Sequence, residues 1–221
     1  MTRRTTFLSR LFQDRSGVAI TEAALILPFF LGAGLWGIEL ANYSLVTMRV
    51  GQLAAHVADN ASRIGDISTL ENRKIYESDI NDLLKGAALQ AGTQMDIYDH
   101  GRVIISSLEV NGDGAQYIHW QRCMGKYNVP SSFGKQGDVL TDGMGKDGQK
   151  VYASDGDAVI FVELQYEYQP LISASFVSKV PIRSVASFTV RSSRDLSQIY
   201  QVNPAAPDPP YTCDKFENAF A

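Results

Sequence analysis

The sequence predicts an α+β protein, in which a long N-terminal membrane-spanning helix is followed by a domain built on an antiparallel β-sheet. Three observations lead to this fold class. An uncharged apolar run covers Ala23–Ile38, and apolar residues then recur at helical spacing as far as Ile64. Beyond residue 101, runs rich in β-branched residues alternate with turn signals. At 221 residues, with 45% hydrophobic residues, the chain fits one globular domain plus an anchor.

The N-terminal arm is basic. Arg3, Arg4, Arg10 and Arg15 precede the apolar run, with Asp14 as the acidic residue among them. Because cytoplasmic flanks carry an excess of Lys and Arg, the arm is expected in the cytoplasm and the rest of the chain beyond the membrane. That remainder is more acidic than the whole chain, whose net charge is −4. An acidic surface argues against nucleic acid as a partner, since phosphate binding needs a basic one.

The junction between the arm and the helix carries an unusual carboxylate. Glu22 follows Gly17 by five positions and stands at the edge of the apolar segment. A charge costs roughly 2.5 to 3.5 kcal/mol at the centre of a membrane helix and less near its end, so this one calls for a functional explanation. A secretory signal peptide would place small residues after its apolar stretch. Glu39, Asn42 and Tyr43 follow here, so no such site is evident.

Residues 16–22 (SGVAITE) resemble the cleavage region of type IV prepilins, in which a glycine precedes the cut and a glutamate is the fifth residue after it. The resemblance implies that a prepilin peptidase cuts between Gly17 and Val18, on the cytoplasmic side, and leaves the helix attached. It also implies that Glu22 pairs with the new amine of Val18 during processing and assembly. Residues 1–17 would then be a cytoplasmic leader peptide.

Two other interpretations of this segment stay open. It fits a simple signal anchor, with Glu22 tolerated near the interface, or a buried helix of a soluble domain. The uncharged run has 16 residues, or about 20 with Val18–Ile20, which is the lower margin for spanning a bilayer.

The helix is predicted to continue to residue 64. Residues 18–64 would measure about 70 Å, with a membrane anchor to about residue 41 and an amphipathic second half that stops at Gly65. Pro28 is expected to kink the first half, because it removes a backbone hydrogen bond. Small residues spaced by four, Ala33, Gly37 and Ala41, form a stripe that permits close approach of another helix, although such residues are also frequent in membrane helices generally.

The remainder, residues 65–221, is predicted to be a periplasmic α+β domain. A capping box at Ser68–Glu71 opens a second helix that ends near Gly92. Residues 125–156 form mainly a long loop, and the proline-rich stretch 204–210 is expected to be extended. The predicted strands are Arg102–Val110, Gln116–Arg122, Asp157–Tyr168 and Ile182–Arg191.

The two cysteines, Cys123 and Cys213, both follow the anchor. With the N-terminus inside, they lie in an oxidising compartment, where a disulfide is expected. The alternative is two buried free thiols. A bridge would close a loop of about 90 residues and stabilise the fold by up to roughly 4.6 kcal/mol.

No motif predicts catalysis, a metal or a cofactor. His56, His100 and His119 are far apart in sequence. Residues 143–148 spell G-x-G-x-x-G but neither follow a convincing strand nor open a helix, so a dinucleotide site is not expected. Four aspartates suggest calcium at first sight, but they lack the EF-hand order and a solvated loop is the simpler interpretation; they are Asp142, Asp147, Asp155 and Asp157.

Three later segments carry a narrower resemblance. Trp120–Gly125, Val162–Leu171 and Arg191–Leu196, together with the junction at Gly17, resemble the TadE/TadG group of pilin-like proteins (pseudopilins) of tight-adherence type IV pilus systems. Asp14 departs from the otherwise basic cleavage arm.

This resemblance implies a pilin-like fold and a non-enzymatic component, such as a minor pilin, or an assembly factor acting in pilus biogenesis and surface adherence. Its implied partners are the prepilin peptidase, other pilin-like subunits, the pilus assembly machinery and the lipid of the bacterial inner membrane. The protein would cross that membrane once and could also enter the pilus. The rival class is an uncleaved membrane-anchored envelope protein with a periplasmic binding domain.

Overall fold

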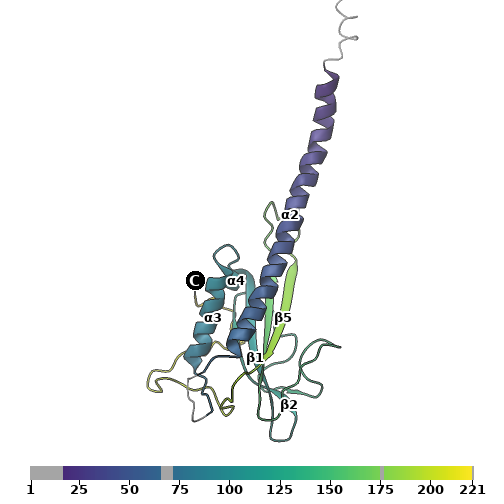
Figure 1. Cartoon of the computed structure of the whole chain (residues 1–221). Helices are drawn as coiled ribbons and strands as arrows, with labels where there is room; N and C mark the ends of the chain where they lie inside the picture. Colours follow the sequence, from purple (N-terminus) through teal and green to yellow (C-terminus); the bar gives the residue numbers. More distant parts are fainter. Residues whose placement is uncertain (1–16, 66–71, 175–176, 221) are drawn as a thin grey trace, which may run out of the picture.

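The computed structural model describes residues 17–65, 72–174 and 177–220, and it confirms the α+β class. One long apolar N-terminal helix, α2 (Val18–Ala61), leads into an antiparallel five-stranded sheet. Figure 1 shows the second part of α2 packed on the folded domain and the first part standing clear of it. The predicted arginine-rich arm and the predicted capping box at residues 68–71 lie outside the described residues.

Helix α2 runs without interruption through Pro28 but ends three residues earlier than the apolar spacing predicts. The reason is a distant arginine. The guanidinium Nη2 of buried Arg194 donates hydrogen bonds to the carbonyl oxygens of Ala61 (3.3 Å) and Ile64 (2.8 Å), and so satisfies groups that the helix end leaves free. Gly65 is not the cap. It permits a close approach, because a Cβ there would lie 3.1 Å from the Lys74 carbonyl oxygen.

Helix α3 (Glu77–Ala91) ends before Gly92, as predicted, but it begins well after the predicted capping box. Its N-terminus is fixed by the Asp79 carboxylate, which accepts a hydrogen bond from the Tyr76 backbone N–H at 3.0 Å. Residues before it are held instead by the distal chain, since Tyr76 forms a bridge with Tyr200. A short helix, α4 (Ile97–His100), which the sequence analysis did not predict, precedes the sheet.

The sheet has the strand order β3-β2-β1-β4-β5, with antiparallel neighbours throughout. Four strands agree with the predicted ones to within two residues at each end, and the fifth, β3, is a two-residue addition inside the predicted long loop. The strands are β1 (Gly101–Val110), β2 (Gln116–Met124), β3 (Val139–Leu140), β4 (Val159–Glu167) and β5 (Pro181–Thr189).

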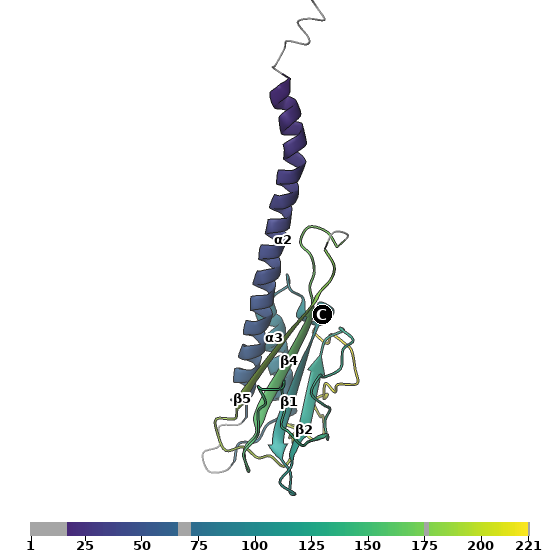
Figure 2. The ribbon, with the colours of Figure 1, turned by 90° about the vertical axis from the view of Figure 1, so that its right-hand side faces the viewer.

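The main core lies between one face of the sheet and the helices α2 and α3. Alternation along β4 separates the two faces, because successive side chains of a strand point in opposite directions. Ile160, Val162 and Leu164 enter the main core, whereas Val159 and Phe161 join a smaller cluster that Met144 of the long loop completes. Figure 2 shows α2 running beside the sheet and continuing well beyond it.

The C-terminal segment is fastened beside β2. Cys123 and Cys213 form a disulfide, as predicted. The Cys123 N–H donates to the Tyr211 carbonyl at 2.8 Å, and the Gly125 N–H donates to the Glu217 carbonyl at 2.9 Å. Farther along the same edge, β3 pairs with β2, and the Ile118 N–H donates to the Asp138 carbonyl. The outer edge of β2 is therefore covered along its length. The proline-rich stretch before the segment includes a turn, since the Ala206 N–H donates to the Asn203 carbonyl.

A fully buried arginine on β1 holds the same segment from within. The Arg102 guanidinium donates to the carbonyl oxygens of Gly125 (3.2 Å), Cys213 (2.7 Å) and Lys215 (3.0 Å). It also lies 4.0 Å from the centre of the Phe216 ring. Burial lowers the pKa of Arg102 to about 10, so the side chain stays charged at neutral pH. The charge is thus matched by carbonyl groups and a ring face.

Candidate functional site: the first half of helix α2

The predicted cleavage junction opens helix α2. Gly17 has helical backbone angles (φ −80°, ψ −18°), and its carbonyl accepts a hydrogen bond from the Thr21 N–H at 3.1 Å. The Thr21 hydroxyl donates to the Val18 carbonyl at 2.8 Å. A Cβ added at Gly17 would meet no atom within 4 Å. The fold of this chain therefore does not require a glycine at position 17.

Glu22 is exposed and lies one helical turn beyond Val18. Four residues advance a helix by about 6 Å, and residues spaced by four share a face. Since helical side chains tilt toward the N-terminus, the carboxylate leans over the turn that begins at Val18. The backbone thus places Glu22 and the nitrogen of Val18 on the same side of the first turn.

The first half of α2, residues 18–41, is mostly apolar and is not covered by the rest of the chain, and it is called the rod below. Its most apolar 18-residue window has a mean hydropathy of 1.9, and none of that window is buried against the rest of the chain. Phe29 is 79% exposed and Ile20 is 72% exposed. Other large apolar side chains at the surface of this half include Leu25, Leu27, Phe30, Leu31, Leu35, Trp36, Ile38 and Leu40. The helix is long and apolar enough to cross a membrane, and a signal sequence would meet the same criteria.

The predicted small-residue stripe lies on this rod. Ala33, Gly37 and Ala41 are all exposed. A Cβ at Gly32, Gly34 or Gly37 would find no neighbour within 4 Å. The chain therefore does not use these glycines for its own packing, and the stripe stays available as a flat surface.

Glu39, which ends the rod, is a residue whose role the sequence analysis missed. Its side chain is only 3% exposed. One carboxylate oxygen accepts hydrogen bonds from the Tyr168 hydroxyl (2.6 Å) and the Leu171 N–H (3.2 Å), and the other accepts one from the Ile172 N–H (3.0 Å). Asn42 donates to the same hydroxyl at 2.8 Å. Glu39 thereby ties α2 to the loop between β4 and β5.

Tyr168 is the third residue in this contact between Glu39 and the loop. Burial, with a further contribution from the Glu39 carboxylate, raises the pKa of Tyr168 to about 12, so the hydroxyl remains a donor at physiological pH. Its ring meets the Tyr43 ring edge to face, with centroids 5.1 Å apart. The signal in the sequence was a lone carboxylate between Ile38 and Leu40, whose partners lie about 130 residues away. A cavity of about 310 Å³ lies beside Glu39, and it is lined by Gly32, Leu35, Trp36, Glu39, Ile172 and Val177.

The three histidines do not come together. His56 lies on α2 and bonds to Gln90, His100 ends α4, and His119 lies on β2. The His119 Nδ1 is 2.8 Å from the Glu109 carboxylate, and this hydrogen bond raises the pKa of His119. Each histidine is thus placed apart from the others.

Two of the four loop aspartates, Asp142 and Asp147, lie close to Lys150. Asp142 pairs with Lys150 at 2.8 Å and accepts a hydrogen bond from the Tyr152 hydroxyl at 2.9 Å. Residues 143–148 lie between β3 and β4, where they open no helix, and Met144 is buried in the smaller core cluster. Within the described ranges, no three or more His, Cys, Asp or Glu side chains are grouped to hold a metal ion.

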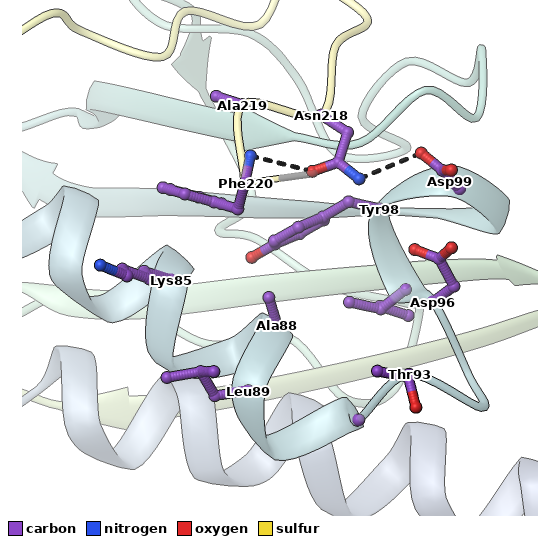
Figure 3. A pocket seen from close by; sticks show the side chains of 12 residues that line it. Lys85, Ala88, Leu89, Thr93, Asp96, Tyr98, Asp99, Asn218, Ala219 and Phe220 are labelled. Carbon is purple, nitrogen blue, oxygen red and sulfur yellow. Dashed lines mark hydrogen bonds between the residues drawn. The ribbon is translucent and has the colours of Figure 1, made fainter.

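Two larger hollows lie on the folded domain. One, of about 570 Å³, is bounded by α3, α4 and the C-terminal segment (Figure 3). Three of its polar side chains have partners within the chain: Asp99 accepts from Asn218 at 3.0 Å and pairs with Lys126 at 2.7 Å, and the Tyr98 hydroxyl donates to the Leu84 carbonyl at 2.6 Å.

The other hollow, of about 650 Å³, is lined by β4, β5 and the long loop. Burial raises the pKa of Glu163 there, and its carboxylate is bonded to the Ser131 hydroxyl and to the Ser132 N–H at 2.8 Å. This carboxylate fastens the loop to the sheet.

Comparisons with protein-family models, with curated proteins and with solved structures found no match to this chain. What distinguishes the molecule is its own geometry, in which an uncovered apolar rod is continuous with a helix packed on a disulfide-bonded domain.

Proposed function

We propose that this chain is a pilin-like membrane protein of a tight-adherence type IV pilus system, acting in pilus biogenesis and adherence without enzymatic activity. The first half of α2 would anchor it in the bacterial inner membrane, with the N-terminus in the cytoplasm and the sheet domain in the periplasm. The observation that carries the proposal is the uncovered apolar half of α2, which is continuous with a half that packs on the sheet. An isolated apolar surface of this size needs lipid or other helices around it.

Gly17 supports cleavage at the junction. Because a Cβ there would meet nothing within the chain, the glycine is not explained by packing or by backbone strain. A peptidase that draws the backbone into a close-fitting site would supply the missing reason, since glycine has no side chain to obstruct that approach. We therefore place the cut between Gly17 and Val18.

Glu22 would act after the cut. Cleavage gives Val18 a positive amine at the end of an apolar helix, and the carboxylate one turn away, or one on a neighbouring subunit, pairs with it. Pairing lowers the cost of taking both charges out of water when a subunit enters a filament. In that filament, the rod would exchange lipid for neighbouring helices, with closest approach along Ala33, Gly37 and Ala41.

The processing step is tested by N-terminal sequencing and mass measurement in cells with an active pilus system. The wild-type protein should begin Val-Ala-Ile-Thr-Glu, whereas Gly17→Leu should retain the 17-residue leader. The matched control is Gly34→Leu, because a Cβ at Gly34 is equally free of contacts and this variant should be cleaved normally. A wild-type protein that still begins at Met1 would favour the uncleaved envelope protein.

The pilus role is tested separately. Deletion of the protein should abolish or shorten surface pili and impair attachment. Glu22→Ala should restore a cleaved protein but not the pili, since it removes the partner of the new amine. Normal pili and normal attachment in the deletion strain would contradict the proposed role.

A further inference from the structure

The loop between β4 and β5, described for residues 168–174 and 177–180, exposes apolar side chains at one end of the sheet. Leu171 is 64% exposed, Val180 is 40% exposed and Ile172 is 38% exposed. Figures 1 and 2 both show this loop rising past the end of the strands and lying beside α2. Exposed branched side chains at a loop end gain nothing from water, so the surface points to an apolar contact.

The loop is held at a fixed level on the helix. Glu39 binds the backbone N–H groups of Leu171 and Ile172, and Val177 packs against the main core. Its one described charged pair, Lys179 with Glu167 at 3.0 Å, lies at the foot of the loop, near the strands. The apolar end is thus clamped to α2 while the charged residues stay back toward the domain.

That level coincides with the expected edge of a bilayer. Val18 and Glu39 are 21 residues apart, which is about 32 Å along a helix. The hydrocarbon core of a bilayer is about 30 Å thick, so if Val18 lies at one boundary, Glu39 lies at the other. Trp36 and Tyr43 flank Glu39 along the helix, and Trp and Tyr concentrate at membrane interfaces. The loop that Glu39 clamps is therefore at the same interface.

We propose that the β4–β5 loop is a second membrane contact, in which Leu171 and Ile172 insert among the phospholipids at the outer boundary of the inner membrane. The proposal rests on the proposed membrane-anchored arrangement of α2. It gives the domain two attachments, the helix and the loop, so that the sheet holds one orientation above the membrane. The Glu39 carboxylate, satisfied by three donors, sets the depth of the loop.

The experiment uses the full chain in phospholipid vesicles, with one environment-sensitive fluorophore per variant. Leu171→Cys probes the loop and Leu27→Cys probes the rod. Val139→Cys is the matched control, because Val139 is 55% exposed and lies on β3, which pairs with β2 at the end of the sheet opposite the loop. The native cysteines are bonded to each other and do not compete for the label. Lipids carrying bromine near the headgroup end of the acyl chain serve as quenchers.

We expect the labels at 171 and 27 to emit at shorter wavelength and lose most of their fluorescence with brominated lipid, and the label at 139 to do neither. Quenching at 27 but not at 171 would overturn the loop contact and leave the anchor standing. No quenching at 27 would overturn the anchored arrangement and the loop contact with it. A wavelength shift at 171 that brominated lipid does not quench, and that fades on dilution of protein in lipid, would assign the surface to a second copy instead.

Discussion

The two halves of helix α2 differ both in how their apolar residues are placed around the helix and in what surrounds them. In the second half the buried residues recur at three- and four-residue intervals, so that one stripe faces the sheet; they are Val50, Leu53, Ala54, Val57, Ala58 and Ala61. In the first half the large apolar residues surround the helix and lie at the surface, and the one buried residue is Glu39.

The placement of the apolar residues indicates what each half of the helix packs against. A one-sided stripe matches one protein partner, and that partner is present in the chain. An apolar surface on all sides matches a surrounding medium, either lipid or a bundle of neighbouring helices. The change from one pattern to the other falls near Glu39, which is hydrogen-bonded to the β4–β5 loop.

The largest expected effect is confined to the folded domain. Replacing both Cys123 and Cys213 by Ser should lower the free energy of unfolding by up to about 4.6 kcal/mol, because the disulfide spans 90 residues. Thermal or denaturant unfolding of the detergent-solubilised chain measures this. Membrane insertion of the rod, assayed by extraction at high pH, should be unchanged. Loss of insertion in the double variant would show that the two halves depend on each other.

A matched leucine pair sharpens the contrast. Leu53→Ala, in the packed half, should cost about 3 kcal/mol, since it leaves a cavity beneath a side chain that is 3% exposed. Leu27→Ala, in the uncovered half, should leave the unfolding midpoint of the domain unchanged. An equal destabilisation by both variants would mean that the rod packs against the domain after all.

The two glutamates of α2 provide a smaller test. Glu39→Gln keeps the shape of the side chain but sets an amide group against backbone donors, and it should cost about 1 to 2 kcal/mol. The same variant should weaken lipid quenching of a label at Leu171. Glu22→Gln, at an exposed position, should change neither the unfolding midpoint nor the quenching. If Glu39→Gln were also silent, the carboxylate would not clamp the loop.

The smallest expected effect is on pH dependence. The hydrogen bond that the His119 ring donates to the Glu109 carboxylate raises the pKa of His119 above its ordinary value near 6.5. Its stabilising contribution is therefore fully present below about pH 6.5 and is lost as pH rises through the raised pKa. The unfolding midpoint should fall across that window in the wild-type protein, and less so in His119→Gln. Identical profiles would remove His119 as the cause.

Local signals predicted the parts of the fold that local chemistry determines. The β-branched runs predicted four strands, Gly92 predicted the end of α3, and the presence of two cysteines after the apolar run predicted the disulfide. The end of α2 was wrong, because the cap is Arg194, more than a hundred residues away. The start of α3 was wrong for a similar reason, since the preceding residues pair with Tyr200.

In the candidate site, too, some residues could be predicted from local sequence and others depend on distant contacts. The junction residues Gly17, Val18 and Glu22 were visible as a pattern, because their spacing along one helix is local. Glu39 was visible only as a charge that ends an apolar run. Its partners Tyr168, Leu171 and Ile172 become neighbours only when the β4–β5 loop folds back on α2, and no spacing rule in one sequence gives that contact.

The covered edge of β2 has a consequence for how copies of the protein can join. An open strand edge offers unpaired N–H groups to another chain, which is the route to strand addition and to aggregation. Here the outward N–H groups of Ile118, Cys123 and Gly125 are all occupied by the chain itself. In the oxidised protein this edge cannot template growth of the sheet from one copy to the next. The disulfide, the hydrogen bonds of Arg102 to the C-terminal segment and the pairing of β3 thus act together to keep one side of the sheet closed to other copies.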